Sequence, residues 1–393
     1  MVNEQALFID VHNYQRRKWN QNVCGDAYLS RRFDNEGRLI AVLSDGLGSG
    51  VKANILSSMT AAMAVKFFSA NKDILRSAEV IMESLPVCQV RKISYATFSV
   101  VDCDLEGTVR VVEEGNPEFV LLRGGIEERV KPIILESKRF PDRRLHVSEI
   151  AMTAGDRIIV CSDGVTQAGM GTPGYPLGWR RESLVDFVEG MIREDPTISS
   201  RHLSQAVVEA SIETEPMGKP LDDTSCLVLY FRTPRRLMVF SGPPLDPARD
   251  AECGSILDSF PGRKAVCGGT TANLVAREWG CRIETQLPKR GCKLPPCSHM
   301  DGVDLVTEGV LTLTQVARRL EEPESPEQDE PADRLIELLL DSDAIEFMVG
   351  TKINEAHQDP NLPVDLEIRR NIIKRIANVL SERYLKKTSI RFI

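Results

Sequence analysis

The chain has 393 residues, a formal net charge of -8, and hydrophobic and charged fractions of 42% and 27%. These values are typical of a globular protein with two domains or one large domain. The acidic balance argues against nucleic acid as the main partner. No apolar run approaches the roughly 20 residues that cross a bilayer, and the N-terminus lacks the basic-then-apolar order of a signal peptide. We therefore expect a cytoplasmic protein, away from the membrane, whose 10 cysteines are mostly reduced.

The first part of the chain is rich in short runs that are typical of strands. The runs at 27–33 and 39–43 flank the turn Asp34-Asn35-Glu36-Gly37 and predict a hairpin. A helix is predicted after Gly50, with one apolar face made of Val51, Ile55, Met59, Ala62, Met63 and Phe67. Further strands are predicted at 95–101, 108–113, 119–122, 157–161 and 226–231, and helices at 73–84, 182–193 and 199–212. This order, with helices in pairs, indicates an antiparallel α+β fold.

The segment 232–236, Arg-Thr-Pro-Arg-Arg, predicts a boundary between a first domain at 1–235 and a second domain at 236–393. In the second part, three strand-like runs each end in a turn rich in Gly and Thr, at 265–271, 305–309 and 347–351. The first two precede plausible helices, which is typical of an α/β domain. If the strands are parallel, these turns gather at the carboxyl edge of the sheet, where ligands bind. We therefore expect a small-molecule ligand or a partner at this domain.

Acidic residues recur at strand ends or in tight turns beside them. Converging carboxylates repel one another unless a cation neutralises them. Oxygen ligands suit Mg²⁺ or Mn²⁺ rather than zinc, and two such ions can activate water and clamp a phosphoryl group. One Asp-Gly pair alone is usually a plain turn, so the prediction rests on the whole set. The set is Gly25-Asp26, Asp45-Gly46, Asp163-Gly164 and Asp222-Asp223.

The glycine-rich loop around Asp45 also allows a competing interpretation, a phosphate-binding loop of a nucleoside triphosphatase. Such a loop needs a lysine directly after its last glycine and a serine or threonine next. Here Val51 separates Gly50 from Lys52, and Ala53 follows. Both chemical requirements fail, so the metal-binding turn is the favoured interpretation.

The segments GD, SDGLGSGVKAN, GNPEFVLLRGG, CSDGV and DDTS occur in this order, over about residues 22–231. Together they resemble the metal-dependent type 2C protein phosphatases, and most of all the stage II sporulation protein E branch. The resemblance implies a β-sandwich flanked by helices, two Mn²⁺ or Mg²⁺ ions, and hydrolysis of phosphoserine or phosphothreonine in a protein. It also implies bacterial signalling, with a phosphorylated protein similar to an anti-sigma-factor antagonist as the default substrate.

The resemblance also assigns roles to the acidic residues. Asp45 would bridge both metals, and the Gly46 carbonyl would bind one of them. Asp163 and Asp222 would hold the second metal, and Asp26 would act directly or through a water.

Some positions depart from the family pattern. Asp223 takes the place of an asparagine found in many relatives, and it is a weaker candidate ligand. Leu47 stands where many members carry a histidine proposed as the general acid, so water at the metals would protonate the leaving group and turnover would be slow. The phosphate-anchoring arginine has no clear counterpart, and Arg16 and Arg17 are the candidates. Leu47 also motivates the alternative of a pseudophosphatase that signals through its second domain, and a homodimer is a further possible feature.

The second domain holds one more candidate site. Cys292, Cys297 and His299, with Cys281 nearby, could form a zinc or redox site. Their spacing is not a standard zinc pattern, so ordinary reduced thiols are the competing interpretation.

Overall fold

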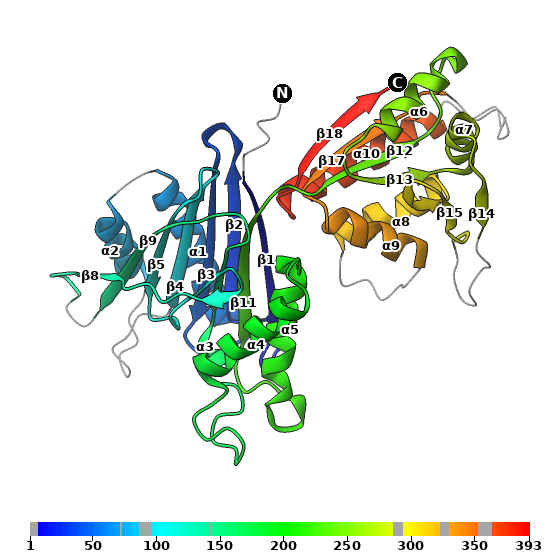
Figure 1. Ribbon diagram of the computed structural model, residues 1–393. Coiled ribbons are helices and arrows are strands. Elements are labelled where there is room, and N and C mark those ends of the chain that lie inside the picture. Colours follow the sequence, from blue (N-terminus) through cyan, green and yellow to red (C-terminus); the bar gives the residue numbers. More distant parts are fainter. Residues whose placement is uncertain are drawn as a thin grey trace. The chain divides into compact units, whose positions relative to one another are not determined.

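The computed structural model describes residues 7–70, 73–85, 96–140, 143–285, 294–322, 330–352 and 364–393, with the side chains of 364–368 excluded. The chain forms two compact units, residues Met1–Thr233 and Pro234–Ile393. Each unit has its own sheets and helices (Figure 1). Within the described residues, no helix is both long and apolar enough to cross a membrane.

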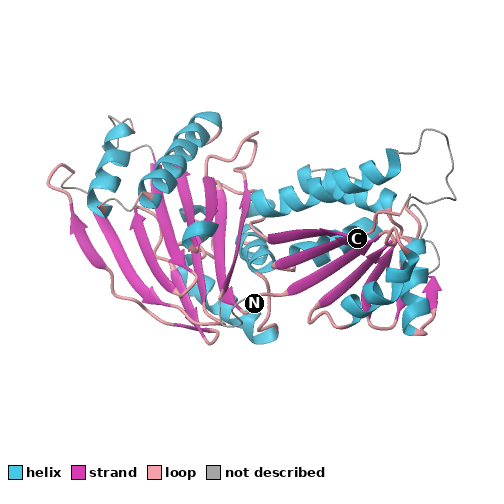
Figure 2. Ribbon diagram, turned by 90° about the horizontal axis from the view of Figure 1, so that it is seen from above, coloured by secondary structure: helices cyan, strands magenta, loops and turns pink. Residues whose placement is uncertain are grey.

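The first unit contains two antiparallel sheets, drawn in magenta in Figure 2. The six-stranded sheet has the order β2-β3-β4-β5-β9-β8, and the five-stranded sheet has the order β1-β11-β10-β6-β7. The first sheet contains β2 (Ala27–Phe33), β3 (Arg38–Gly46), β4 (Ala96–Asp104), β5 (Thr108–Glu114), β8 (Ile133–Glu136) and β9 (Arg144–Ala151). The second contains β1 (Phe8–Arg16), β6 (Val120–Arg123), β7 (Ile126–Glu127), β10 (Arg157–Cys161) and β11 (Thr224–Arg232).

Helices cover the sheets of the first unit. The hydrophobic cluster between α1 (Val51–Ser69), α2 (Ile74–Ser84) and the six-stranded sheet includes Ile40, Val42 and Phe98. A second cluster joins α4 (Arg180–Glu194) and α5 (Ser200–Glu213) to the five-stranded sheet. The shorter elements are α3 (Asp163–Thr166), η1 (Asp34–Glu36) and η2 (Pro216–Gly218). The predicted antiparallel α+β class is therefore confirmed.

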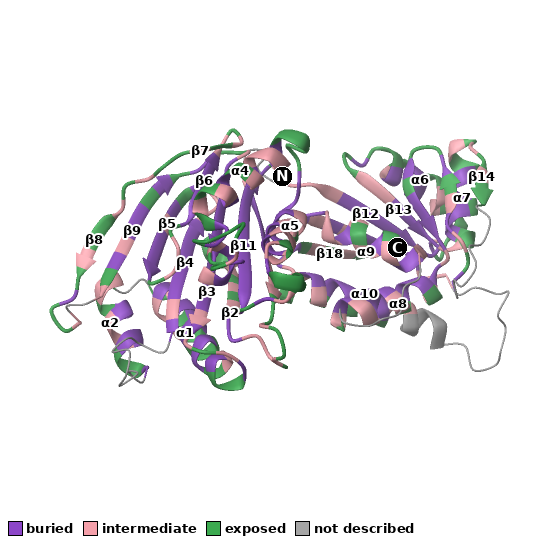
Figure 3. Cartoon of the chain, turned by 90° about the horizontal axis from the view of Figure 1, so that it is seen from below, coloured by how far each residue is buried: buried purple, intermediate pink, exposed green. Residues whose placement is uncertain are grey.

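Strand β3 lies at the centre of the first unit. Its residues Leu39 to Leu43 are fully buried, on both faces of the strand, and Figure 3 draws this part of the sheet in purple. Ile40 and Val42 pack against the helices, while Leu39, Ala41 and Leu43 point to the opposite face. The strand that carries Asp45 at its end is thus held from both sides.

The apolar face predicted for α1 is wrong. Val51, Ile55 and Met59 are 62%, 53% and 49% exposed, and Ala62 is exposed as well. The face turned to the sheet instead carries small residues together with a few large ones, namely Ala53, Leu56, Ser57, Thr60, Ala61, Ala64, Val65 and Phe68. Small residues let the helix approach the sheet closely, and its buried hydroxyls bond to backbone carbonyls, as Ser57 does to Gly25. Because apolar residues occur on two faces of the helix, the sequence did not show which face is buried.

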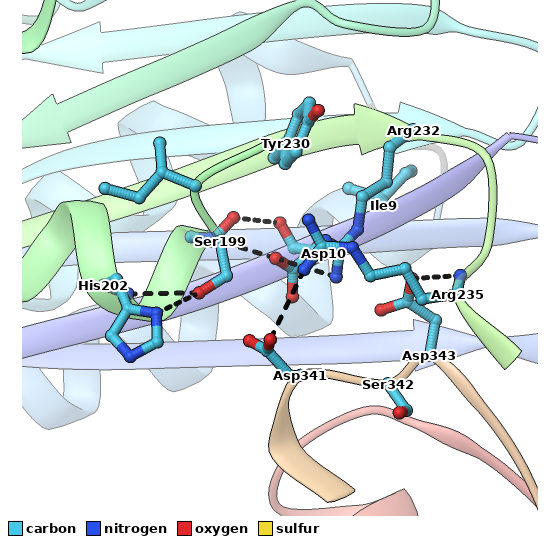
Figure 4. Close-up of polar contacts among 12 residues, drawn as sticks. Ile9, Asp10, Ser199, His202, Tyr230, Arg232, Arg235, Asp341, Ser342 and Asp343 are labelled. Carbon is cyan, nitrogen blue, oxygen red and sulfur yellow. Dashed lines mark hydrogen bonds and ion pairs between the residues drawn. The ribbon is translucent and has the colours of Figure 1, made fainter. Parts of the chain in front are cut away.

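Strand β1 lies in a part of the chain whose pattern did not predict an element. It pairs with β11 along its whole length, from Phe8 opposite Arg232 to Arg16 opposite Thr224. A buried ion pair fastens this pairing, because the Arg232 guanidinium lies 3.3 Å from the Asp10 carboxylate (Figure 4). The same carboxylate accepts the Ser200 backbone N–H at the first turn of α5. This buried network holds β1, β11 and α5 together.

The second unit contains a mainly parallel sheet in the order β14-β15-β16-β13-β12-β17-β18. Its parallel strands are β12 (Arg236–Ser241), β13 (Arg263–Cys267), β16 (Val303–Thr307), β17 (Ala344–Val349) and β18 (Lys387–Phe392), and β14 (Ile283–Thr285) and β15 (Ser298–Met300) are antiparallel. Helices α6 (Asp250–Asp258) and α7 (Gly269–Trp279), with η3 (Pro247–Arg249) before α6, belong to one face, and α8 (Val310–Glu321), α9 (Glu330–Leu340) and α10 (Val364–Glu382) to the other. The predicted α/β architecture is confirmed here as well.

The cysteine and histidine candidates of the second unit do not form a site among the described residues. Cys292 lies outside the described part of the chain. Cys297 is buried in a hydrophobic cluster with Leu294, whereas the His299 side chain is 63% exposed and lies 3.5 Å from Asp301. All eight cysteines in the described ranges are free thiols.

Candidate active site

Two pairs of strands bring the acidic residues to one end of the first unit. Asp26 directly precedes β2 and Asp45 lies near the end of β3; since Ala27 is opposite Ser44, Asp26 is opposite Asp45. Asp163 begins α3 just after β10, and Asp222 lies just before β11. β10 and β11 are also paired, up to Cys161 opposite Cys226. Each sheet therefore supplies one pair of carboxylates.

The charges of the two pairs act on one another. Burial raises the pKa of Asp45 to about 10, and the nearby carboxylates of Asp26, Asp163 and Asp222 add to the shift. Burial also raises the pKa of Asp26 to about 7 and the pKa of Asp222 above its usual range. Asp45 is thus affected by acids of both sheets, and the Ser225–Asp26 hydrogen bond joins the sheets at the same end, so the four acids are here called the acidic cluster.

Two serines hold Asp26 in place. The Ser225 hydroxyl donates to Asp26 Oδ2 over 2.6 Å, and the Ser225 backbone N–H donates to Ser162 Oγ over 3.0 Å. Asp26 is 2% exposed, and its other oxygen, Oδ1, has no hydrogen-bond partner among the described residues. A buried carboxylate with one oriented oxygen and one unsatisfied oxygen is suited to a ligand that brings positive charge.

Asp223 is turned differently from Asp222. Its Oδ1 accepts the Lys18 backbone N–H over 2.9 Å, and its Oδ2 is buried without a hydrogen-bond partner in the described structure. A Cβ atom on Gly25 would lie 2.7 Å from that Oδ2. Asp223 thus ties the loop before β2 to the loop before β11, and only one of its oxygens is left for a further contact.

Two glycines are required by close backbone contacts. A Cβ atom on Gly46 would lie 2.2 Å from the Ala53 carbonyl and 2.9 Å from the Gly25 carbonyl. A Cβ atom on Gly164 would lie 2.1 Å from the Asp223 carbonyl. These are far below contact distance, so only glycine allows the acid-bearing turns to approach each other and the first turns of α1.

Helix α1 fastens the Asp26 segment directly. Its Asn54 side chain donates to the Cys24 carbonyl over 2.9 Å, and its Ser57 hydroxyl donates to the Gly25 carbonyl over 2.6 Å. Any shift of α1 would therefore be transmitted to Asp26 through Gly25, and to Asp45 through Gly46.

The cluster fits a divalent cation by its chemistry. It offers only oxygen ligands, as Mg²⁺ and Mn²⁺ prefer, and its carboxylates repel one another at neutral pH. The unsatisfied Asp26 Oδ1 points to the same conclusion. In the described chain, however, no three acidic, histidine or cysteine side chains already surround a common point as the ligands of one ion would. The residues fit the ions, but small side-chain adjustments must accompany their binding.

The structure places the predicted acids at one end of the unit, and it also shows neighbours that sequence reasoning missed. Lys18 is one such residue, since its Nζ lies 3.8 Å from Asp222 Oδ1. The predicted phosphate anchors differ from it: Arg16 pairs with Glu209 at 2.7 Å, and Arg17 is exposed. Lys18 stands directly beside them in sequence, so only its tertiary contacts with Asp222 and Asp223 distinguish it from the two arginines. Leu47, half-buried in the turn after Asp45, offers no proton.

Comparison with known protein families identifies the first unit. A model of the stage II sporulation protein E (SpoIIE) family matches residues 35–232, which is just over half of the chain. The chain belongs to the SpoIIE family. The matched range contains Asp45, Gly46, Asp163 and Asp222, whereas Asp26 lies before it.

Solved structures similar to this SpoIIE-family chain include three from bacterial regulation. The phosphatase domain of SpoIIE from Bacillus subtilis is 19% identical, with 58% of this chain and 94% of that chain covered and a TM-score of 0.44. The RsbU and RsbW domains of a Mycobacterium tuberculosis protein are 20% identical, with coverages of 65% and 68% and a TM-score of 0.49. RsbX in complex with magnesium is 17% identical, with coverages of 59% and 98% and a TM-score of 0.39. A search of curated proteins gave no significant match.

Proposed function

We propose that this chain is a Mn²⁺- or Mg²⁺-dependent phosphatase that hydrolyses phosphoserine or phosphothreonine in a protein. One observation carries the proposal: two pairs of carboxylates from two sheets, Asp26 with Asp45 and Asp163 with Asp222, lie at one end of the unit, and Asp26, Asp163 and Asp222 all raise the pKa of Asp45. A protein gains nothing in stability from such repulsion, so the cluster indicates a function that uses cations. Membership of the SpoIIE family supports phosphoester hydrolysis as that function.

The residues of the cluster would divide the work as follows. On the six-stranded sheet, Asp45 and the Gly46 carbonyl would hold the ions, and Asp26 would hold them directly or through a water. On the other sheet, Asp163 and Asp222 would hold them. The bound ions would supply charge neutralisation for the phosphoryl group and activation of a water molecule. Ser225 keeps Asp26 oriented, and Lys18 places an ammonium group at the edge of the cluster, where it can face an anionic substrate.

The substrate that we propose is a small phosphorylated regulatory protein, similar to an anti-sigma-factor antagonist. Membership of the SpoIIE family supports this proposal.

The direct test is phosphate release from a phosphoserine peptide by the full chain. We expect release with Mn²⁺ or Mg²⁺ and none after a chelator removes the ions, with recovery when Mn²⁺ is added back. Absence of release from every phosphopeptide and from p-nitrophenyl phosphate, with either ion, would contradict the proposal.

The alternative proposal is a pseudophosphatase that binds phosphoprotein without turnover, and Leu47 is the observation that favours it. A leucine cannot protonate the leaving group, which lowers turnover but does not prevent ion binding. The same assay separates the two proposals, because a pseudophosphatase would bind the phosphopeptide and release no phosphate.

For the second unit we propose a regulatory role with a small-molecule ligand at the carboxyl edge of its parallel sheet. In the strand order β16-β13-β12-β17-β18, the strands that follow β12 are added first on one side of it and then, from β17, on the other. Open α/β sheets bind ligands at such a switch point, here between β12 and β17. Glycines follow these strands at Gly242, Gly268 and Gly350. We expect a phosphate-bearing nucleotide to raise the melting temperature of the full chain, and a Gly268→Val variant to lose this increase. No increase with any nucleotide would contradict a nucleotide ligand.

A further inference from the structure

Two loops of the first unit run side by side next to the acidic cluster. One spans residues 17–22 before β2, and the other spans residues 215–221 before β11. The Trp19 backbone N–H donates to the Pro220 carbonyl over 2.8 Å and joins them. The first loop also reaches the cluster itself, through the Lys18 N–H on Asp223. Both loops are thus fixed to the segments that carry the acids.

These loops expose large apolar side chains. Trp19 is 58% exposed, Met217 84% and Leu221 55%. Leu221 directly precedes Asp222 of the cluster, and Trp19 directly follows Lys18, whose ammonium group lies at the edge of the cluster. An exposed tryptophan grouped with other apolar residues marks an interaction surface more often than an accident of the surface.

The shape of the second loop is held by hydrogen bonds. Met217 adopts a left-handed backbone, with φ of 59°, at the tip of η2. The Gly218 N–H donates to the Glu215 carbonyl, and the buried Glu215 carboxylate accepts the Leu221 N–H over 3.2 Å. These hydrogen bonds therefore hold Met217 and Leu221 in a defined arrangement on the surface.

Positive charge surrounds the exposed apolar residues. The Lys219 ammonium lies 4.5 Å from the centre of the Trp19 ring, and the Lys18 ammonium lies 3.8 Å from Asp222. Arg17 is exposed in the same loop. Three cations on this small surface contrast with the net charge of -8 of the whole chain. The surface therefore complements an acidic partner.

We propose that Trp19, Met217, Lys219 and Leu221, here called the Trp19 platform, dock the segment of the substrate protein that flanks its phosphorylated residue. The preferred segment carries an apolar residue and acidic residues within about three positions of the phosphoresidue, since an extended chain spans about 10 Å over that length. This inference rests on the proposed function, because a phosphoryl group at the acidic cluster places the flanking residues at the platform.

The test compares two phosphopeptides and one small substrate. One peptide has leucine and aspartate residues around phosphoserine, the other has serine and lysine residues, and p-nitrophenyl phosphate has no flanks. For Trp19→Ala we expect kcat/KM on the first peptide to fall about 30-fold, mainly through KM, and at least about 10-fold more than on p-nitrophenyl phosphate. Lys219→Glu should reduce or reverse the preference for acidic flanks. The controls are Ile126→Ala, which truncates a residue that is 67% exposed elsewhere in the unit, and Lys138→Glu, which reverses another exposed charge.

Two results would overturn the platform: equal losses on the peptide and on p-nitrophenyl phosphate in Trp19→Ala, or equal use of both peptides by the unmodified chain. Failure of the proposed function gives a different result, since no substrate would then be hydrolysed. In that case, fluorescence anisotropy of the labelled acidic phosphopeptide still decides the question. Binding that is weakened by Trp19→Ala and not by Ile126→Ala would support the platform, and binding unaffected by either change would refute it.

Discussion

Replacing Asp45 by asparagine is expected to reduce phosphate release by at least about 100-fold, the loss typical when one group that stabilises the transition state is removed. Of the four acids, Asp45 has the pKa that burial and the neighbouring carboxylates raise most, and we propose that it would help to hold the ions. Asparagine keeps its shape and one carbonyl oxygen but loses its negative charge. The measurement is kcat/KM on a phosphoserine peptide with saturating Mn²⁺.

In the absence of metal, Asp45→Asn should be more stable than the unmodified chain. A loss of activity together with higher stability cannot be explained by misfolding. Burial raises the pKa of Asp45 to about 10, from 3.8 in an unfolded chain. A group with a raised pKa loses its contribution to stability as pH rises from the unfolded value through the folded value. Asp45→Asn removes this loss, so in chelator its melting temperature should exceed that of the unmodified chain at pH 8, by a margin that shrinks toward pH 4.

The matched control is Asp186→Asn, which removes one charge from an exposed position of α4. It should change neither activity nor the pH dependence of melting. Full activity in Asp45→Asn, or a loss of activity that Asp186→Asn shares, would rule out the role assigned to Asp45.

A single methyl group added at Gly46 should disrupt the site and destabilise the first unit. In Gly46→Ala the new Cβ would lie 2.2 Å from the Ala53 carbonyl, an atom of the α1 backbone that no rotamer change can move. Either α1 or the end of β3 must shift, at a cost of roughly 3 kcal/mol. Since α1 also holds the Gly25 carbonyl through Ser57, we expect weaker Mn²⁺ binding as well as a lower melting temperature.

Gly174→Ala serves as the control for this variant, because a Cβ atom there meets nothing within 4 Å and no left-handed φ is required. It should unfold within about 0.5 kcal/mol of the unmodified chain, as surface substitutions usually do. Equal stability of Gly46→Ala and Gly174→Ala in urea would show that the backbone around Asp45 is not as tightly packed as described.

The convergence of the acids could be predicted from sequence because each stands beside a glycine or another acid, either at the end of a strand-like run or in a tight turn beside one. Residues at the ends of neighbouring strands lie close together at one edge of a sheet, and strand ends can be recognised from the local sequence pattern. The strand directions were also predictable, from the placement of helices between strands. Strands that follow one another with few helices between them indicate an antiparallel sheet in the first part, and alternating strands and helices indicate a parallel sheet in the second.

The neighbours of the acids were not predictable, because they depend on long-range register. Ser225 reaches Asp26 only because β11 and β2 begin at the same place, although the two residues are 199 positions apart. Lys18 differs from Arg16, which ends β1, because it lies in the loop after the strand, where its backbone N–H is held by Asp223, 205 positions away. The burial of α1 was mispredicted because the face toward the sheet consists mostly of small residues, while several large ones, such as Val51 and Ile55, are exposed.

Calorimetric titration of Mn²⁺ into the metal-free full chain tests the central claim most directly, namely that these carboxylates form a cation site. The account predicts saturable binding of two ions per chain, with at least one of them lost in Asp45→Asn and both kept in Asp186→Asn. No saturable binding to the unmodified chain, or identical binding to it and to Asp45→Asn, would contradict the account.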